Sequence, residues 1–469
     1  MKIVVCIRQG RNGEMSLFEA SAYESALRIP DSEVILLSMG VPSSADYLKS
    51  LTRLGAKKAI LLTDVRVAGA DTLATAYALS LALKKIRPDY VFCGRQTMEG
   101  DTGQTGPMLS ELLGFNVLTE SMGIESITAE SISCKTRNEG KMSVTSPALV
   151  TFERICELRL PSLFSKMGEV EIWSADDVGA DAEECGLKGS PTRVIETFEN
   201  QSGKRKCVFL EKNELIPTIE KALAKDSETV FSKTQSDKKL GKVLIIGKKP
   251  MKFAESISDD IKVIESDSED EIVKIIESEK PEAVLWATDA RSKRLAGRIA
   301  AGMKLGLCAD CTSLETDGET LYMYRPALSG KIIAKIKSLT KPAMATVRTE
   351  ENTKERIVVS FGYGAKDHVD RVKAFAERIG ADVGSSRKVV DHGLISYDTQ
   401  IGLTGRIISP EVYIAIGISG AVQHIVGMQN SKTVIAINSD RQAPIFEYAD
   451  YGFVMSAEDI NYNLQKEVL

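Results

Sequence analysis

The sequence has no apolar run that approaches the roughly 18 to 20 residues of a membrane-spanning helix, so we expect no membrane span. It also lacks a strong charge of one sign: the formal net charge of −5 argues against a nucleic-acid-binding face. The first residues enter an apolar run directly, without the basic and apolar segments of a signal peptide. Eight scattered cysteines fit a reducing compartment, and we therefore expect a soluble cytoplasmic protein.

A convincing metal-binding motif is missing as well. Cys308 and Cys311 form a single CxxC pair. Without a second pair or a nearby histidine, this spacing is weak evidence for zinc or an iron–sulfur cluster. We interpret the pair as structural and predict no metal site.

What the chain does contain is an alternation of short apolar runs and amphipathic stretches. Residues 2–8 (KIVVCIR) are typical of a buried strand, and residues 71–86 have the apolar spacing of a helix. This alternation predicts an α/β fold built on parallel sheets. The rhythm is lost over residues 196–240, which are polar and indicate an arm or linker, and it resumes afterwards.

Two glycine-rich segments follow predicted strands. Residues 94–107 connect a strand to a helix, where backbone N–H groups and the helix dipole can hold an anion; the segment is neither a P-loop nor GxGxxG, and a plain loop is the default interpretation. Residues 391–450 hold the strand-like runs EVYIAIG and TVIAIN, with Gly417 to Gly420 between them. In α/β sheets, ligands bind at such strand-to-helix turns.

The second segment closely resembles the FAD-binding domain of electron transfer flavoprotein α subunits. The motifs that carry the resemblance are QIGLTG at 400–405, PEVYIAIGISGAVQH at 410–424, GMQNSKT at 427–433 and APIF at 443–446. Their order and spacing are those of the family. The resemblance implies a bound FAD that carries electrons and needs no catalytic nucleophile or acid–base pair, so we predict no catalytic residues.

The first half resembles the β subunit of the same family. The loop 94–107 is similar to the family's nucleotide loop, with Glu99 in place of the usual aspartate, and GLKGSPTRV at 186–194 matches the motif of its extended arm. The resemblance implies that β and α subunits are fused in one chain, with Rossmann-like parallel-sheet domains. We expect a β-subunit-like nucleotide-binding domain at 1–195, the arm at 196–240, a shortened α-subunit-like N-terminal domain at 241–350 and the FAD-binding domain at 351–469.

The family motifs also imply site residues. Arg387 would lie over the isoalloxazine, Thr404 near its N5, His424 at its N1 and C2=O edge, and Asn438 at the adenosine part. The full set implied for FAD is Ser386, Arg387, Gln400, Ile401, Gly402, Leu403, Thr404, Gly405, Gly417, Ser419, Gly420, Ala421, Val422, Gln423, His424 and Asn438. The set implied for AMP, or for a second FAD, is Cys6, Ser38, Gly100, Asp101, Thr102, Gly103, Gln104, Thr105 and Gly106.

The resemblance implies an electron carrier more than an enzyme with its own substrate. It would carry electrons from a flavin dehydrogenase to an oxidoreductase or quinone reductase. One alternative is an electron-bifurcating member that oxidises NADH with two FADs, although the loop sequence EGDTGQTGP favours AMP. A second alternative is a flavin-free regulatory protein that binds an adenine nucleotide.

The sequence departs from the family pattern at three FAD-domain positions. Tyr363 replaces a phosphate-facing arginine, Leu403 a glutamine and Ser456 an aspartate, which predicts weaker or altered FAD binding. In the first half, Leu160 to Leu163 resembles the leucine anchor that recognises partners, but the basic run that usually follows is absent. This difference predicts a partner other than the common acyl-CoA dehydrogenases.

Overall fold

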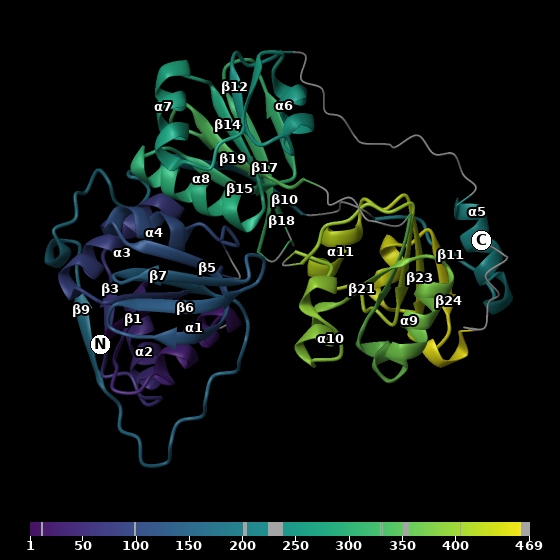
Figure 1. Cartoon of the computed structure of the whole chain (residues 1–469), viewed down its shortest axis with the longest axis horizontal. Coiled ribbons are helices and arrows are strands. Elements are labelled where there is room, and N and C mark those ends of the chain that lie inside the picture. Colours follow the sequence, from purple (N-terminus) through teal and green to yellow (C-terminus); the bar gives the residue numbers. More distant parts are fainter. Residues whose placement is uncertain are drawn as a thin grey trace. The chain divides into compact units, whose positions relative to one another are not determined.

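The computed structural model describes residues 1–10, 13–97, 100–199, 204–223, 238–328, 330, 332–349, 356–403 and 405–460. The chain forms two compact units, each assembled from separate segments. The first contains Met1–Thr197, Thr234–Leu328 and Ala334–Arg348, and the second contains Phe198–Lys233, Ser329–Ile333 and Thr349–Leu469. Figure 1 labels their elements. The predicted fold class, mixed α/β with several parallel-sheet domains, is confirmed.

The N-terminal half of the first unit is built on a nine-stranded sheet of order β7-β6-β5-β8-β4-β1-β2-β3-β9. Its strands are β1 (Lys2–Cys6), β2 (Glu33–Met39), β3 (Lys58–Leu62), β4 (Tyr90–Gly94), β5 (Asn116–Ile127), β6 (Ser131–Thr136), β7 (Lys141–Thr145), β8 (Ala148–Phe152) and β9 (Glu169–Trp173). The helices are α1 (Leu17–Leu27), α2 (Ser44–Thr52), α3 (Thr72–Ile86) and α4 (Thr105–Leu113). The central strands β1, β4 and β8 are apolar and buried, as a sheet covered on both faces requires.

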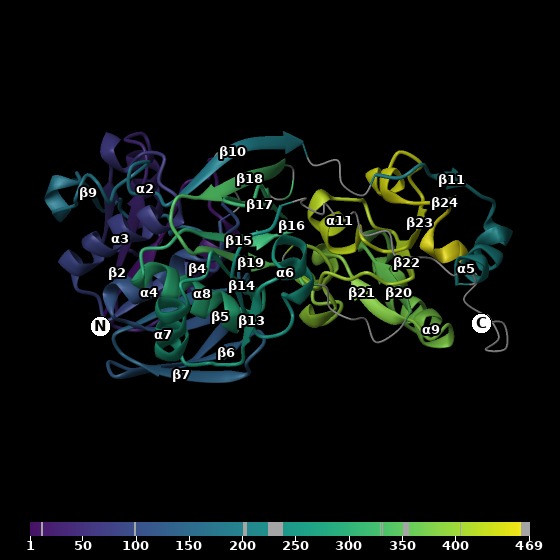
Figure 2. The same ribbon diagram turned by 90° about the horizontal axis from the view of Figure 1, so that it is seen from above.

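Two further sheets complete the first unit. A parallel sheet of order β13-β12-β14-β19-β15 comprises β12 (Val243–Ile246), β13 (Ile261–Ile264), β14 (Ala283–Ala287), β15 (Leu307–Cys311) and β19 (Ala343–Val347). Its helices are α6 (Met251–Ile257), α7 (Glu269–Glu279) and α8 (Ala290–Gly302). A four-stranded sheet contains β10 (Thr192–Glu199), β16 (Ser313–Thr316), β17 (Leu321–Ala327) and β18 (Ile332–Ser338), and Figure 2 shows β10 running beside β18.

The two ends of the first unit share one apolar core. Val4, Leu83 and Met108 belong to the same buried cluster as Leu244 and Trp286. Helices α4 and α8 pack closely, since a Cβ on Gly297 would lie 2.8 Å from the Pro107 Cβ. Segments on either side of residues 196–240 therefore fold as one body.

The second unit has a parallel sheet of order β11-β24-β23-β22-β20-β21. Its strands are β11 (Val208–Phe209), β20 (Ile357–Phe361), β21 (Asp382–Ser385), β22 (Val412–Ile416), β23 (Thr433–Asn438) and β24 (Tyr451–Val454). Its helices are α5 (Leu215–Leu223), α9 (Val369–Arg378), α10 (Arg387–Asp391) and α11 (Val422–Met428).

The segment predicted as an arm contributes regular structure to this second sheet. β11 adds to β24 in parallel (Figure 1). α5 buries Leu215 and Ile219 in the core around β20 and β22. The sequence pattern missed β11 because a two-residue strand shows no period. It missed α5 because the polar residues on both sides of this short helix dominate the composition of the segment.

Candidate functional site

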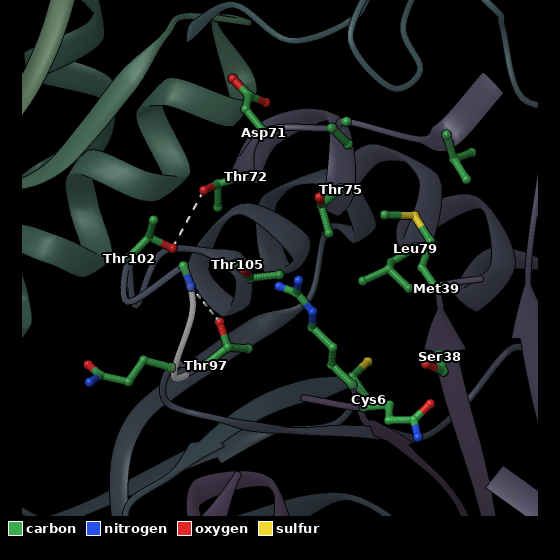
Figure 3. A pocket seen from close by; sticks show the side chains of 18 of the residues that line it. Cys6, Ser38, Met39, Asp71, Thr72, Thr75, Leu79, Thr97, Thr102 and Thr105 are labelled. Atoms are coloured by element: carbon green, nitrogen blue, oxygen red, sulfur yellow. Dashed lines mark hydrogen bonds between the residues drawn. The ribbon is translucent and has the colours of Figure 1, made fainter. Parts of the chain in front are cut away.

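The first unit contains a cavity of about 1250 Å³ at the carboxyl ends of parallel strands. Figure 3 shows side chains around it, among them Cys6 at the end of β1 and Ser38 and Met39 on β2. The chain runs from β1 to β2 and β3 on one side and then returns to β4 on the other, so the strand order reverses between β1 and β4. Ligands of open α/β sheets bind at such a point.

Two thiols lie where the order reverses. Cys6 and Cys93 occupy paired positions on β1 and β4, and both line the cavity. The contact with Cys6, together with burial, raises the pKa of the Cys93 thiol well above its usual value. Cys93 is therefore protonated at neutral pH and serves as a small apolar surface.

The glycine-rich loop after β4 forms another wall. Asp101 and Gly103 have positive φ angles of 55° and 64°, and Gln96 Nε2 donates a hydrogen bond of 2.8 Å to Asp101 Oδ1. The hydroxyls of Thr72 and Thr102 lie 3.5 Å apart across the cavity mouth (Figure 3). The loop ends at the nine-residue helix α4, whose first N–H groups have no partners within the helix and favour an anion.

Six of the nine residues predicted for this site line the cavity, namely Cys6, Ser38, Gly100, Thr102, Gly103 and Thr105. Asp101, Gln104 and Gly106 do not line it and are buried. A Cβ on Gly106 would lie 2.5 Å from the Thr151 side chain, and one on Gly297 would lie 2.5 Å from Gln104 Oε1. These three residues pack the loop against neighbouring elements.

Sequence reasoning missed the part of the cavity that comes from the C-terminal half of the first unit. Leu307 and Cys308 of β15, Arg325 and Ala327 of β17, and Ala334 of β18 all line it. They lie more than 200 residues beyond the glycine-rich loop, so no local spacing could have linked them to it. The available signal was Arg325 itself, a charged residue followed by Pro326 at the end of the strand-like run LYMY.

The second unit brings its predicted residues to an equivalent point of strand reversal. β20 lies between β21, which follows it, and β22, which starts the opposite side of the sheet. Ser386 and Arg387 follow β21, Gly417 follows β22, and Asn438 ends β23. The carboxyl ends of these parallel strands therefore gather the predicted FAD residues at one edge.

Close backbone packing explains the glycines at this edge. A Cβ on Gly420 would lie 2.1 Å from the Ile445 amide nitrogen, and one on Gly417, at φ 63°, would lie 2.7 Å from that of Ala365. The loop 400–405 is tied to α11 by the Leu403 N–H, which donates to the Gln423 carbonyl at 2.6 Å. A Cβ on Gly402 would lie 2.6 Å from that same carbonyl oxygen. Ile401 and Gly405 lie in the same turn, and the predicted residue Thr404 lies outside the described residues.

His424 is buried on α11 and contacts Tyr413 of β22. Its Nε2 lies 2.7 Å from the Tyr413 hydroxyl. Burial lowers the pKa of His424 to about 4, so the imidazole is neutral at pH 7. When the Tyr413 O–H donates to Nε2, the remaining proton lies on Nδ1, which is buried beside the Ile401 backbone. A buried N–H donor of this kind fits the carbonyl oxygen of a flavin.

The remaining predicted FAD residues are placed around these loops. Arg387 begins α10, half-buried, with its Nε 3.9 Å from the Asp391 carboxylate. Asn438 Nδ2 donates to the Ile418 carbonyl at 2.9 Å and so braces the turn 417–420. Ser419 and Ala421 are exposed and Val422 and Gln423 are half-buried, where α11 begins.

At two of the three positions that depart from the family pattern, neighbouring side chains supply the charge that the substituted residue lacks. The Tyr363 ring is contacted by two ammonium groups, Lys388 Nζ at 4.2 Å and Lys366 Nζ at 4.9 Å from its centroid. Positive charge is therefore retained near the position of the missing arginine. Ser456 caps a short helix through Asp459, which brings a carboxylate to the region where the sequence has lost one.

The comparison with protein families decides what this fold is. The electron transfer flavoprotein domain matches residues 3–177 and 268–374, more than half of the chain. The chain belongs to the electron transfer flavoprotein family. The electron transfer flavoprotein FAD-binding domain matches residues 352–429, which include His424 and the turn 417–420. The predicted FAD-binding domain and the electron-transport role of the family are thereby confirmed.

Curated relatives match parts of the chain. The electron transfer flavoprotein subunit alpha of Thermoanaerobacterium thermosaccharolyticum is 36% identical over 229 residues, which are 39% of this chain and 69% of that protein. Protein FixA of Azorhizobium caulinodans is 39% identical over 230 residues, which are 45% of this chain and 82% of that protein. The Pseudomonas aeruginosa subunit alpha is 48% identical over 120 residues, which are 25% of this chain and 39% of that protein.

The described residues contain neither a membrane-spanning helix nor a cluster of metal ligands. No helix there has the length and hydrophobicity to cross a membrane. No group of three or more His, Cys, Asp or Glu side chains in that part of the chain is arranged to hold a metal ion, and all eight cysteines are free thiols.

Proposed function

We propose that this protein is a single-chain electron transfer flavoprotein that carries FAD in its second unit and AMP in the cavity of its first. It accepts electrons from a flavin dehydrogenase and delivers them to an oxidoreductase or quinone reductase in the cytoplasm. The observation that carries the proposal is the FAD-binding domain, whose loops meet at a point of strand reversal around Gly417 and His424.

The extents of the matches support a fusion of two subunits. The match to the electron transfer flavoprotein domain falls in two separate segments, 3–177 and 268–374. The relatives named subunit alpha and FixA correspond to 39% and 45% of the chain, so neither accounts for all of it. A β-like half followed by an α-like half explains both findings.

FAD supplies the electron-carrying chemistry, and the protein's own residues hold and tune it. The buried Nδ1–H of His424 would donate a hydrogen bond to a ring carbonyl. Arg387 would place a positive charge beside the ring, which stabilises negative charge on the reduced flavin. Arg387→Ala should therefore lower the flavin potential in a redox titration. Arg371→Ala, an exposed arginine on α9, should leave that potential unchanged.

The partner surface in this proposal is the loop 160–168. Leu160, Leu163 and Phe164 are 90%, 93% and 92% exposed, which is unusual for three large apolar side chains so close together. An exposed apolar patch with few charges fits an apolar pocket on the redox partner better than an acidic surface.

A second candidate function is supported by the size of the cavity. Its volume of about 1250 Å³ exceeds the roughly 300 to 1,000 Å³ of most small-ligand pockets and would accept a dinucleotide as well as AMP. With a second FAD there, the chain would be an electron-bifurcating enzyme that oxidises NADH.

The test is nucleotide stoichiometry. The purified chain is denatured, and the released FAD and AMP are quantified per chain. One FAD with one AMP supports the carrier, whereas two FADs without AMP support the bifurcating enzyme. A chain that holds no flavin after incubation with FAD would overturn both and leave a flavin-free regulatory protein.

A further inference from the structure

One charged side chain from the C-terminal half of the first unit reaches the nucleotide cavity. Arg325 lies on β17, is only 5% exposed and lines the cavity wall. Its Nε has no hydrogen-bond partner among the described residues. A guanidinium N–H that is removed from water and has no acceptor is costly, so a ligand in the cavity is the natural source of one.

The charges around Arg325 do not balance. Lys293 Nζ lies 2.8 Å and Arg348 Nη2 3.8 Å from the carboxylate of Asp310, so that single carboxylate serves two cations. Asp101 is the other carboxylate of the cluster, and it already accepts a hydrogen bond from Gln96. Burial raises the pKa of Asp101 to about 6, against the opposing effect of the Arg325 charge. Lys293, Arg325 and Arg348 therefore face two carboxylates. Arg95 also lies near Asp101 but is paired with Glu153 at 2.6 Å, so the buried excess is positive.

Arg325 lines the same cavity as the glycine-rich loop 94–107, which favours a phosphate. Asp101 belongs to the glycine-rich loop, and its neighbours Gly100 and Thr102 line the same cavity as Arg325. The loop leads to the N-terminus of α4, which favours negative charge. Arg325 belongs to the four-stranded sheet and lines the same cavity, and a guanidinium matches the geometry of phosphate oxygens.

We propose that Arg325 binds the phosphate of the adenine nucleotide in this cavity, so that a strand of the C-terminal half completes the nucleotide site of the N-terminal half. This inference rests on the proposed function, because it assumes a nucleotide in the cavity. It adds a binding residue that lies outside the β-like half altogether.

The test compares AMP with adenosine, which lacks the phosphate, on the full-length protein freed of bound nucleotide. Isothermal titration should show that Arg325→Met weakens AMP binding about tenfold to a hundredfold, since it removes a charged hydrogen bond. The same variant should change the affinity for adenosine less than about twofold, because a neutral ligand has no use for the guanidinium. Arg325→Lys keeps the charge but loses the fork, and it should show an intermediate loss for AMP.

The matched control is Arg348→Met. It removes one cation from the same buried cluster but from a side chain that does not line the cavity. The ratio of AMP to adenosine affinity should stay as in the unaltered protein. If Arg325→Met does not fold, the ratio of AMP to adenosine affinity is measured on Arg325→Lys instead. An unchanged ratio in the Arg325 variants overturns the inference, whereas an unaltered protein that binds neither AMP nor FAD in the cavity overturns the proposed function instead.

Discussion

At the scale of single residues, His424 shows how burial decides the charge of a binding group. Its folded-state pKa of about 4 lies below the ordinary value near 6.5, because burial disfavours the imidazolium. Between pH 6.5 and 4, His424 is protonated in the unfolded chain but stays neutral in the folded chain. The stability of the second unit should therefore fall as the pH drops from 6.5 towards 4, and it should be independent of this group above 6.5.

The variant His424→Asn should remove that part of the pH dependence. In calorimetry of the flavin-free protein, its loss of unfolding free energy between pH 6.5 and 4 should be smaller than that of the unaltered protein by up to about 3 kcal/mol. Asp101, whose raised pKa acts in the opposite direction over this range, cancels in the difference. His392→Asn removes an exposed imidazole from the same unit and serves as the control. Parallel pH profiles for the two variants would contradict the role of burial.

Motifs located such residues but could not say what their side chains do. The family resemblance predicts Asn438 at the adenosine part of FAD, whereas the structure shows its amide donating a hydrogen bond to the Ile418 carbonyl. Gln104 belongs to the nucleotide loop by sequence, yet its amide packs beside Gly297, almost 200 residues further on. The direction in which a side chain points depends on neighbours that are distant in the chain. The spacing of residues in the sequence carries no information about those neighbours.

At the scale of elements, the turn 417–420 requires glycine for two separate reasons, a left-handed φ angle and a close backbone contact. Gly420 combines a φ of 91° with a backbone contact, since a Cβ there would lie 2.1 Å from the Ile445 amide nitrogen. Gly393 has a φ of 70° with nothing within 4 Å of its Cβ position. Gly393→Ala should cost only the left-handed strain of about 1 to 2 kcal/mol. Gly420→Ala should cost more than this in thermal unfolding and should also weaken FAD binding in a fluorescence titration. Equal losses for the two variants would show that the contact is unimportant.

The arm offers a second test at this scale. Ile219 of α5 is fully buried in the core of the second unit, and Ile216 is only partly buried. Ile219→Ala should lower the unfolding free energy of the second unit by about 2 to 5 kcal/mol, because it leaves a cavity. Ile216→Ala should cost clearly less. Calorimetry should show the transition of the first unit unchanged in both, and a shift there would contradict the division into two units.

The helix α3 was predictable from the sequence and the two-residue strand β11 was not. α3 has fifteen residues, a regular apolar stripe and an N-cap, since Asp71 accepts a hydrogen bond from the Ala74 N–H. β11 has two residues and is fixed only by its pairing with β24. Local sequence determines the first kind of element, whereas tertiary contacts determine the second.

At the scale of the whole molecule, each unit is built from chain on both sides of residues 224–237. The first unit joins residues 1–197 to 234–348 through a shared core, and the second joins the arm to the FAD-binding domain. Sequence order alone suggests a series of separate domains, because the pairing of distant segments is invisible to local patterns. In the folded chain, each unit instead combines a segment before residues 224–237 with a segment after them.

Cutting the chain between Leu223 and Lys238 at an inserted protease site should therefore leave one complex in size-exclusion chromatography. The two fragments are held by independent contacts, the packing of α4 on α8 and the burial of α5 in the second core, and linked contacts reinforce each other. Gly297→Leu should disrupt the first contact, since a Cβ at Gly297 would already lie 2.5 Å from Gln104 Oε1, and Ile219→Asp should disrupt the second. Either variant alone should keep the cut fragments together, and only the double variant should release them. Fragments of the unaltered protein that separate after cutting would show that the covalent link, and not the shared cores, holds the molecule together.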